Sequence, residues 1–256
     1  MTDSQIIYEQ PLNERIRTFM RLDFLYQQAR ESLRSHSEFD SRNTVMAILD
    51  IQNAFTRSDI KAETLKELER LGTVLEHLSK NPNVDGQVLN SLLDEIDVAI
   101  DSVRAAKGPI GSQLRSNELL SCVRQRSSIA GGTCNFDMPN YHYWLSQPND
   151  LKSNDLKEWL SYFEPILTSS QLVLRLIRES TPGSSELAKD GFFQRTLDSN
   201  LPCHLIRVTV PNSCPYYAEI SGGKHRFSVR FLKLNLYDRD IAASEDVEFT
   251  LTCCTL

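Results

Sequence analysis

The feature that most constrains the fold is a change in the spacing of apolar residues along the chain. Near the start, apolar residues recur every three or four positions, as they do on one face of a helix. This first set comprises Leu12, Ile16, Phe19, Leu22, Tyr26, Ala29 and Leu33. The last quarter of the chain instead has short segments that alternate apolar and polar residues, which is typical of strands. One chain with both patterns in separate regions predicts an α+β fold.

Helices account for most of the first 180 residues. The first is predicted to begin near Asn13, a good N-cap, and to run for roughly 20 residues. Three more are predicted from Asn43 to Phe55, from Lys61 to Ser79 with a break at Asn81-Pro82-Asn83, and from a cap at Asp85 to a stop at Lys107-Gly108-Pro109. Helical signals return from Tyr141 to Glu179, where Pro165 predicts a kink or a new start.

Strands are predicted in the remainder. Four short segments rich in β-branched and aromatic residues run from Cys203 to Val210, Tyr216 to Ser221, His225 to Lys233 and Val247 to Cys254. Earlier, Ser121 to Ile129 and Thr133 to Phe136 flank Ala130-Gly131-Gly132, which predicts a β-hairpin with a glycine turn. Thr181 to Ser185 is expected to be a linker or an exposed turn.

These elements suggest two domains. A helical bundle of residues 11–110 and 140–180 is expected to pack on a mostly antiparallel, sandwich-like β domain of residues 1–10, 111–139 and 186–256.

Composition limits the possible functions. The chain has 256 residues, 40% of them hydrophobic and 24% charged, a composition typical of a globular rather than a disordered protein. Its net charge of -6 gives no basic field that favours nucleic acid, but a local basic patch within this average leaves that partner open. No stretch reaches the ~20 apolar residues that a membrane-spanning helix needs. The N-terminal residues lack the apolar core of a signal peptide. We therefore expect a cytoplasmic protein whose six cysteines are reduced.

The most informative polar pattern lies in the strand predicted from residue 225. Alternation places Lys224, Arg226, Ser228 and Arg230 on one face and His225, Phe227, Val229 and Phe231 on the other. The aromatic face is expected to be core. The basic face is either a solvated surface, which the pattern alone favours, or a site for an anion or an acidic peptide, because arginine suits carboxylates.

Two more basic groups have the same two interpretations. Arg17 and Arg21 share a face of the first helix with Arg15 nearby. Arg124 and Arg126 alternate on the predicted hairpin strand and form a third cluster with Arg115.

Catalytic signatures are weak. The sequence has no G-x-S-x-G, H-E-x-x-H, G-x-G-x-x-G or phosphate-binding loop motif. Cys134 and His142 are eight positions apart and are candidates for a nucleophile and base or for metal ligands, although packing roles are favoured. Cys253 and Cys254 would point in opposite directions from a strand, so both binding one metal ion is disfavoured. The sequence predicts neither an enzyme nor a metal site.

Three longer segments carry a family resemblance. They are YEQPLNERIRTFMRLDFL at Tyr8–Leu25, VRQR at Val123–Arg126 with FDMPNYHYWL at Phe136–Leu145, and EISGGKHRF at Glu219–Phe227 continuing to Arg230 and Phe231. In order and spacing they resemble the N-terminal, central and C-terminal signatures of the ZapD family.

This resemblance implies a helical domain plus a β domain in a homodimer, without enzymatic activity or cofactor. It implies binding to the C-terminal peptide of FtsZ and cross-linking of FtsZ filaments at midcell. The positions that match the basic surface of the family are Arg17, Arg21, Arg124, Arg126, His142, Lys224, Arg226 and Arg230. The alternatives are a nucleic-acid-binding regulator that uses the same arginines and, less favoured, a hydrolase that uses Cys134 and His142.

Overall fold

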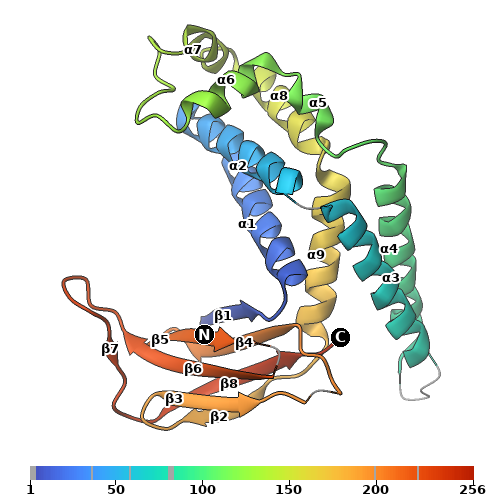
Figure 1. Ribbon diagram of the computed structural model, residues 1–256, viewed down its shortest axis with the longest axis vertical. Helices are drawn as coiled ribbons and strands as arrows, with labels where there is room; N and C mark the ends of the chain where they lie inside the picture. Colours follow the sequence, from blue (N-terminus) through green and yellow to red (C-terminus); the bar gives the residue numbers. More distant parts are fainter. Residues whose placement is uncertain (1–3, 36, 58, 80–83, 199, 224) are drawn as a thin grey trace. The chain divides into compact units, whose positions relative to one another are not determined.

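The computed structural model describes residues 4–35, 37–57, 59–79, 84–198, 200–223 and 225–256. The chain forms two compact units (Figure 1). Met1–Thr18 and Leu174–Leu256 make up one, which we call the β unit, and Phe19–Val173 make up the other, the helical unit. The boundary falls within two helices, α1 (Glu14–Arg34) and α9 (Glu164–Glu179). The α+β fold class expected from the sequence is confirmed.

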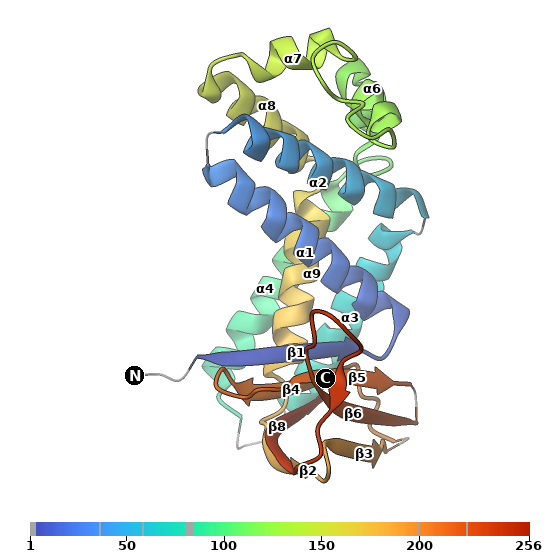
Figure 2. The same ribbon diagram turned by 90° about the vertical axis from the view of Figure 1, so that its left-hand side faces the viewer.

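The helical unit contains most of the helices. Besides parts of α1 and α9, its helices are α2 (Glu38–Arg57), α3 (Ile60–Leu78), α4 (Gly86–Ala105), α5 (Ser112–Arg115), α6 (Glu118–Arg126), α7 (Pro139–Leu145) and α8 (Asn149–Ser161). Figure 1 shows α3 and α4 side by side, and Figure 2 shows the same helices after a turn of 90°. The four helices predicted before residue 110 are confirmed. Pro165 marks a new start rather than a kink, because α9 begins one residue before it. Among the described residues, no helix has a run of apolar residues long enough to cross a membrane.

Two helix starts follow the capping chemistry expected from the sequence. The Ile16 backbone N–H donates to Asn13 Oδ1 at 2.9 Å before α1, and Asp85 Oδ1 accepts from two backbone N–H groups at the start of α4. Each cap satisfies donors that the first helical turn leaves unpaired. The predicted break at Asn81-Pro82-Asn83 lies outside the described residues.

The hairpin predicted for residues 121–136 is wrong. Residues 118–126 form α6, and turns follow it, so this part of residues 111–139 belongs to the helical unit and not to a β domain. The overlooked signal was Asn117, whose Oδ1 caps the helix by accepting from the Leu120 N–H at 3.0 Å. Leu120 and Val123 are three apart and buried, which is a helical spacing.

The glycine pair still forms tight turns, but it follows a helix. Gly131 has a positive φ of 71°, which favours glycine. A Cβ on Gly132 would lie 2.5 Å from the carbonyl oxygen of Arg126. The pair therefore lets the chain fold back closely on the end of α6.

The β unit consists of two antiparallel sheets. Sheet A has the strand order β1-β4-β8-β2, and sheet B has the order β3-β6-β5 with β7 paired to β6. The strands are β1 (Gln5–Pro11), β2 (Ser184–Ala188), β3 (Phe192–Thr196), β4 (Leu205–Pro211), β5 (Tyr217–Gly222), β6 (Arg226–Lys233), β7 (Ile241–Ala242) and β8 (Val247–Cys254). The four predicted strands correspond to β4, β5, β6 and β8. Strands β1, β2, β3 and β7 were not predicted, and Ser184 and Ser185 belong to β2 rather than to a turn.

One core holds the two sheets together. Along β6, Phe227, Val229 and Phe231 are buried while Arg226 and Arg230 are exposed, so the predicted alternation is confirmed for these residues. His225, predicted to lie on the core face, is instead exposed, because it precedes the first residue of the strand. The buried residues pack with Val208 of β4 and Phe249 of β8, both from sheet A. Burial of the apolar set on β6 therefore directs its basic set to the outside of the unit.

Candidate partner-binding surface

The outward side of sheet B carries the basic row predicted from the sequence. Arg226, Ser228 and Arg230 lie on this side of β6, opposite Thr196, Gln194 and Phe192 of β3, respectively. On the other flank, Ser221 and Glu219 of β5 lie opposite Ser228 and Arg230. Directly opposed residues of antiparallel strands share a face. We call this set the outer basic face. Lys224, predicted to belong to the same row, lies outside the described residues.

A hollow of about 470 Å³ opens at the Arg226 end of this face. It is lined by Gln194, Ser221, Gly222, Gly223, His225, Arg226, Phe227 and Ser228. The lining combines a guanidinium, an imidazole, an amide and hydroxyl groups, which suits a polar or anionic ligand better than an apolar one.

The two arginines of the outer basic face differ in their surroundings. Arg230 lies opposite the carboxylate-bearing Glu219, whereas Arg226 lies opposite the neutral Thr196. Among the described residues, neither arginine forms an ion pair within the protein. Both guanidinium groups are exposed, so a ligand could pair with them without breaking an internal contact.

Arg17 lies at the same corner of the β unit. Its guanidinium pairs with Glu14 and donates from Nη2 to the carbonyl oxygen of Pro11, the last residue of β1, at 3.5 Å. The next residue, Leu12, packs so closely on Gly222 that a Cβ there would lie 2.7 Å from Leu12 Cδ2. Gly222 also lines the hollow beside Arg226. This chain of contacts connects Arg17 to the hollow, although the two arginines are far apart in the sequence.

Arg21 lies one turn after Arg17 on α1, in the helical unit, and is exposed. Residues four apart on a helix are neighbours on its surface, so the two arginines share one helix face, as predicted.

Arg124 and Arg126 do not share a face, and this corrects the predicted arrangement. On a strand they would point the same way, but in α6 two positions correspond to about 200° of rotation. Arg124 points inward and its Nη1 donates to Gln52 Oε1 of α2 at 3.0 Å. Arg126 is exposed, and its Nη1 lies 3.7 Å from Asp137 Oδ1. Arg124 thus connects two helices, and Arg126 remains a candidate surface cation.

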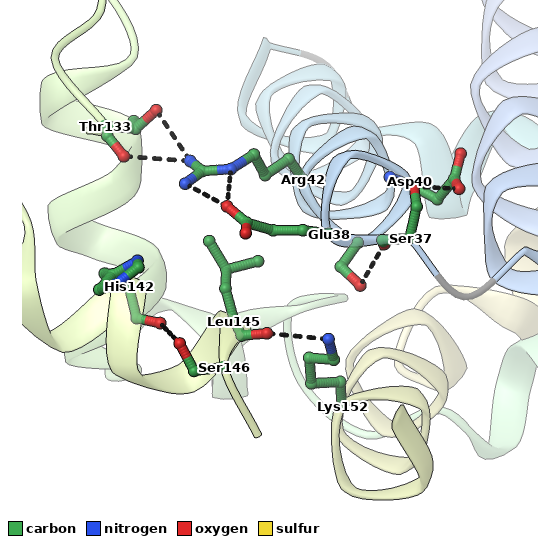
Figure 3. Close-up of polar contacts among 10 residues, drawn as sticks. Ser37, Glu38, Asp40, Arg42, Thr133, His142, Leu145, Ser146 and Lys152 are labelled. Atoms are coloured by element: carbon green, nitrogen blue, oxygen red, sulfur yellow. Dashed lines mark hydrogen bonds and ion pairs between the residues drawn. The ribbon is translucent and has the colours of Figure 1, made fainter. Parts of the chain in front are cut away.

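His142 is exposed on α7, whose ends are held by the surrounding chain. Figure 3 shows the Ser146 hydroxyl donating to the His142 carbonyl oxygen at 2.8 Å and Lys152 Nζ donating to the Leu145 carbonyl oxygen at 2.8 Å. Beside α7, Arg42 donates to the Thr133 carbonyl oxygen at 3.0 Å and pairs with Glu38. These contacts fix the backbone that presents the imidazole.

The aromatic residue before His142 is fully packed. Burial raises the pKa of Tyr141 well above its usual range, and the Arg42 guanidinium lies 5.1 Å from the centre of its ring. Arg42 was not predicted to contribute to this surface. Its signal was the Glu38–Arg42 spacing of four on a helix, which is typical of an ion pair.

The flanking residues of β3 were also missed, since that strand was not predicted. The alternation of Phe193 and Arg195 with Phe192, Gln194 and Thr196 was the available signal. Five residues are too few to separate this pattern from a loop without knowledge of the neighbouring strands.

We expect Arg124→Ala to destabilise the helical unit by about 1–3 kcal/mol. The substitution leaves the Oε1 atom of Gln52, a side chain only 2% exposed, without the Arg124 donor. Both tryptophans, Trp144 and Trp159, lie in this unit, so their fluorescence during urea unfolding measures the change. Arg126→Ala is the matched control and should cost less than about 1 kcal/mol, because its ion pair is exposed. Equal losses of stability in both variants would contradict the assignment of Arg124 as a connection between helices and of Arg126 as a surface cation.

Neither role considered for Cys134 and His142, a nucleophile with its base or a pair of metal ligands, is supported by contacts among the described residues. Cys134 Sγ donates to Asp137 Oδ2 at 3.5 Å, and no hydrogen bond joins it to His142 among the described residues. Within the same part of the chain, no three His, Cys, Asp or Glu side chains are placed to hold one metal ion.

Comparison with known proteins gives a consistent picture. The sequence model of ZapD, described as a cell division protein, matches residues 20–230. A protein named Cell division protein ZapD from Methylococcus capsulatus is 46% identical over 253 residues, covering 99% of each chain. The proteins of that name from Coxiella burnetii and Nitrosomonas europaea are each 35% identical, over 258 and 251 residues, with at least 95% of either chain covered. This chain therefore belongs to the ZapD family of cell division proteins.

Proposed function

We propose that this protein is a non-enzymatic cross-linker of FtsZ filaments, which binds the acidic C-terminal tail of FtsZ. Membership of a family of cell division proteins supports the cellular role. The outer basic face, with the hollow beside Arg226, supports the kind of ligand. Such a protein acts in the cytoplasm at midcell and needs neither metal nor cofactor.

The observation that carries the proposal is the exposure of two arginines on a rigid strand beside a polar hollow. A guanidinium presents several donors in one plane and forms paired hydrogen bonds with a carboxylate. Strand β6 is central in sheet B, so its side chains have a fixed spacing. An acidic peptide that lies across this face would find charge partners without displacing any internal ion pair.

The remaining basic residues extend this proposed site. Arg17 lies at the same corner of the β unit and Arg21 follows on α1, while Arg126 and His142 are exposed in the helical unit. We assign Arg226, Arg230 and Arg17 of the β unit to the primary contact, and we propose Arg21 as a further partner-binding residue of the helical unit. Arg124 is a helix-to-helix connector, and its contribution to binding is indirect.

The direct test is binding of a fluorescently labelled FtsZ tail peptide, measured by anisotropy, together with co-sedimentation of the full protein with FtsZ filaments. We expect saturable peptide binding and protein in the filament pellet. A scrambled peptide of equal charge and a DNA duplex serve as competitors. Displacement of the peptide by DNA at equal charge concentration would favour the nucleic-acid-binding alternative, and absence of binding to filaments would refute the proposal.

We expect the peptide affinity to fall as salt rises. The proposed contacts join exposed charges, and salt screens these over ~8 Å at physiological ionic strength and ~3 Å at 1 M. Anisotropy titrations between 50 mM and 500 mM salt, roughly spanning this range, measure the effect. An affinity independent of salt would contradict a charge-based contact even if FtsZ remained the partner.

We expect a homodimer at micromolar concentration. Cross-linking needs two tail sites in one particle, and a two-fold symmetric dimer supplies two identical sites. Two sites also raise the overall affinity for a filament that displays many tails. Light scattering coupled to size exclusion measures the mass, for which a dimer is twice the 29.2 kDa of one chain. A monomer that still bundles filaments would require two different tail sites on one chain.

A further inference from the structure

Two cysteine thiols meet at one end of the β sandwich. Cys253 lies near the end of β8, and Cys203 lies just before β4. The backbone N–H of His204 donates to the Cys254 carbonyl oxygen at 2.8 Å, which holds the chain after Cys203 against the end of β8. The Cys203 thiol donates to the Leu205 carbonyl oxygen at 3.5 Å and lies within hydrogen-bonding reach of the Cys253 thiol. Both are half-buried against the sandwich core, so they are neither sealed inside nor free on the surface.

A guanidinium lies beside this thiol pair. Arg195, at the end of β3, hydrogen-bonds to Cys253 and forms an ion pair with Glu186 of β2 at 2.7 Å. Its guanidinium also lies 5.2 Å from the centre of the Phe193 ring, which restricts its position. Strands from both sheets therefore bring a cation to one of the two sulfur atoms.

The two thiols are electrostatically unequal. The hydrogen bond to Cys203 lowers the pKa of Cys253, and the charge of Arg195 acts in the same direction against the effect of burial. The same hydrogen bond, together with burial, raises the pKa of Cys203. These two directions favour Cys253 over Cys203 as the thiolate of the pair. A thiolate is the reactive form of cysteine toward oxidants.

We propose that Cys203 and Cys253 are a redox-active pair that hydrogen peroxide converts to an intramolecular disulfide. The Cys253 thiolate attacks one peroxide oxygen, the O–O bond breaks, and the departing hydroxide takes up a proton to become water. This leaves a sulfenic acid on Cys253. The Cys203 sulfur then attacks the Cys253 sulfur, the S–O bond breaks, and the hydroxyl leaves as water with the Cys203 proton. One peroxide is reduced to two waters while two thiols are oxidised to one disulfide.

The pair is separate from the proposed FtsZ site. The Cys253 side chain faces the interior of the sandwich in register with Ile206, whereas Arg226 and Arg230 face outward on β6. In a reducing compartment such a pair is a dithiol that an oxidant closes transiently. Oxidation of the two thiols can therefore be tested without reference to FtsZ binding.

Peptide mapping of the full, peroxide-treated protein tests the proposal. Trypsin releases Cys203 in residues 196–207 and Cys253 together with Cys254 in residues 240–256. We expect these two peptides to be joined under non-reducing conditions, with a mass about 2 Da below their sum, corresponding to the two hydrogens lost on oxidation. A reductant should separate them. Peroxide treatment that oxidises other cysteines while leaving these peptides unlinked would overturn the proposal.

Three variants assign the roles. Cys254→Ala is the matched control, because it removes the neighbouring thiol and should leave the cross-link intact. Cys203→Ser should abolish the cross-link and leave a sulfenic acid on Cys253 that dimedone traps, and Cys253→Ser should abolish both. A cross-link that disappears in Cys254→Ala but persists in Cys253→Ser would refute the assigned pair. If a serine variant does not fold, the peptide map of Cys254→Ala still decides, because Cys253 is then the sole cysteine of residues 240–256.

Discussion

Arg226→Glu is expected to weaken binding of the FtsZ tail peptide by at least tenfold. The substitution places a carboxylate at the hollow of the outer basic face, where an acidic peptide would then meet repulsion instead of a guanidinium. Like charges brought together at an interface cost several kcal/mol, and each 1.4 kcal/mol corresponds to about tenfold in affinity. Anisotropy with the labelled peptide measures the loss, and co-sedimentation with filaments measures the consequence for bundling.

A second charge reversal, on helix α1, shows whether the proposed contact also includes the helical unit. Arg21→Glu should reduce binding to a similar extent if α1 and the outer basic face contact one peptide. Lys66→Glu, on the exposed side of α3, is the control and should bind normally. Loss in only one of the two arginine variants would confine the site to one unit. Normal binding by both would mean that these arginines are merely solvated.

Folding must survive for this experiment to be informative. Arg21 and Arg226 are exposed and form no ion pair within the described part of the chain. Surface substitutions of this kind usually change stability by no more than about 0.5 kcal/mol. Unchanged thermal unfolding of the variants would therefore assign any loss of binding to the contact itself.

Phe231→Ala is expected to destabilise the β unit by about 3–5 kcal/mol, the usual cost of removing a buried phenylalanine ring. Phe231 is 1% exposed and its ring centre lies 5.3 Å from that of Phe249, on the opposite sheet. The tryptophans lie in the helical unit, so their fluorescence does not follow this change directly. Hydrogen exchange of peptides from β6 and β8, measured by mass spectrometry, reports the opening free energy of the β unit.

Phe192→Ala is the matched control for this prediction. It removes the same ring from the outward side of sheet B, where Phe192 is 45% exposed and lies opposite Arg230. We expect a loss of about 1 kcal/mol or less. Similar losses from the two variants would contradict the division of sheet B into a buried face and an outer basic face.

The elements that the sequence predicts well are those with many periodic residues. The apolar residues Ile16, Phe19 and Leu22 of α1 are buried, and the alternation along β6 separates Phe227 from Arg226 as expected. In both elements, several successive apolar residues repeat with the same spacing. Their burial supplies most of the free energy that stabilises the element in the folded protein.

The wrong predictions fall in segments where the sequence pattern is short or ambiguous. Residues 121–126 contain two arginines at a spacing of two, and this suggested a strand although the Asn117 cap and the spacing of Leu120 and Val123 favour a helix. As a result the role of Arg124 changed from a surface cation to a connection with Gln52. Strand β3 was not predicted because it has only five residues and lies at the edge of its sheet. Its strand conformation depends on pairing with β6, which is distant in the sequence.

The sequence by itself determined the α+β class, the family and the outward row of arginines on β6. The fold class and the row of arginines follow from the spacing of apolar and polar residues along each element. The family follows from three segments that match family signatures in the same order. Each of these signals depends only on residues that are close together in the sequence. Tertiary structure alone decided which distant residues meet. The contact of Leu12 with Gly222 connects Arg17 to the hollow beside Arg226, and the pairing of β4 with β8 brings Cys203 to Cys253. Such contacts depend on strand register and on the packing of two sheets, which no local pattern encodes.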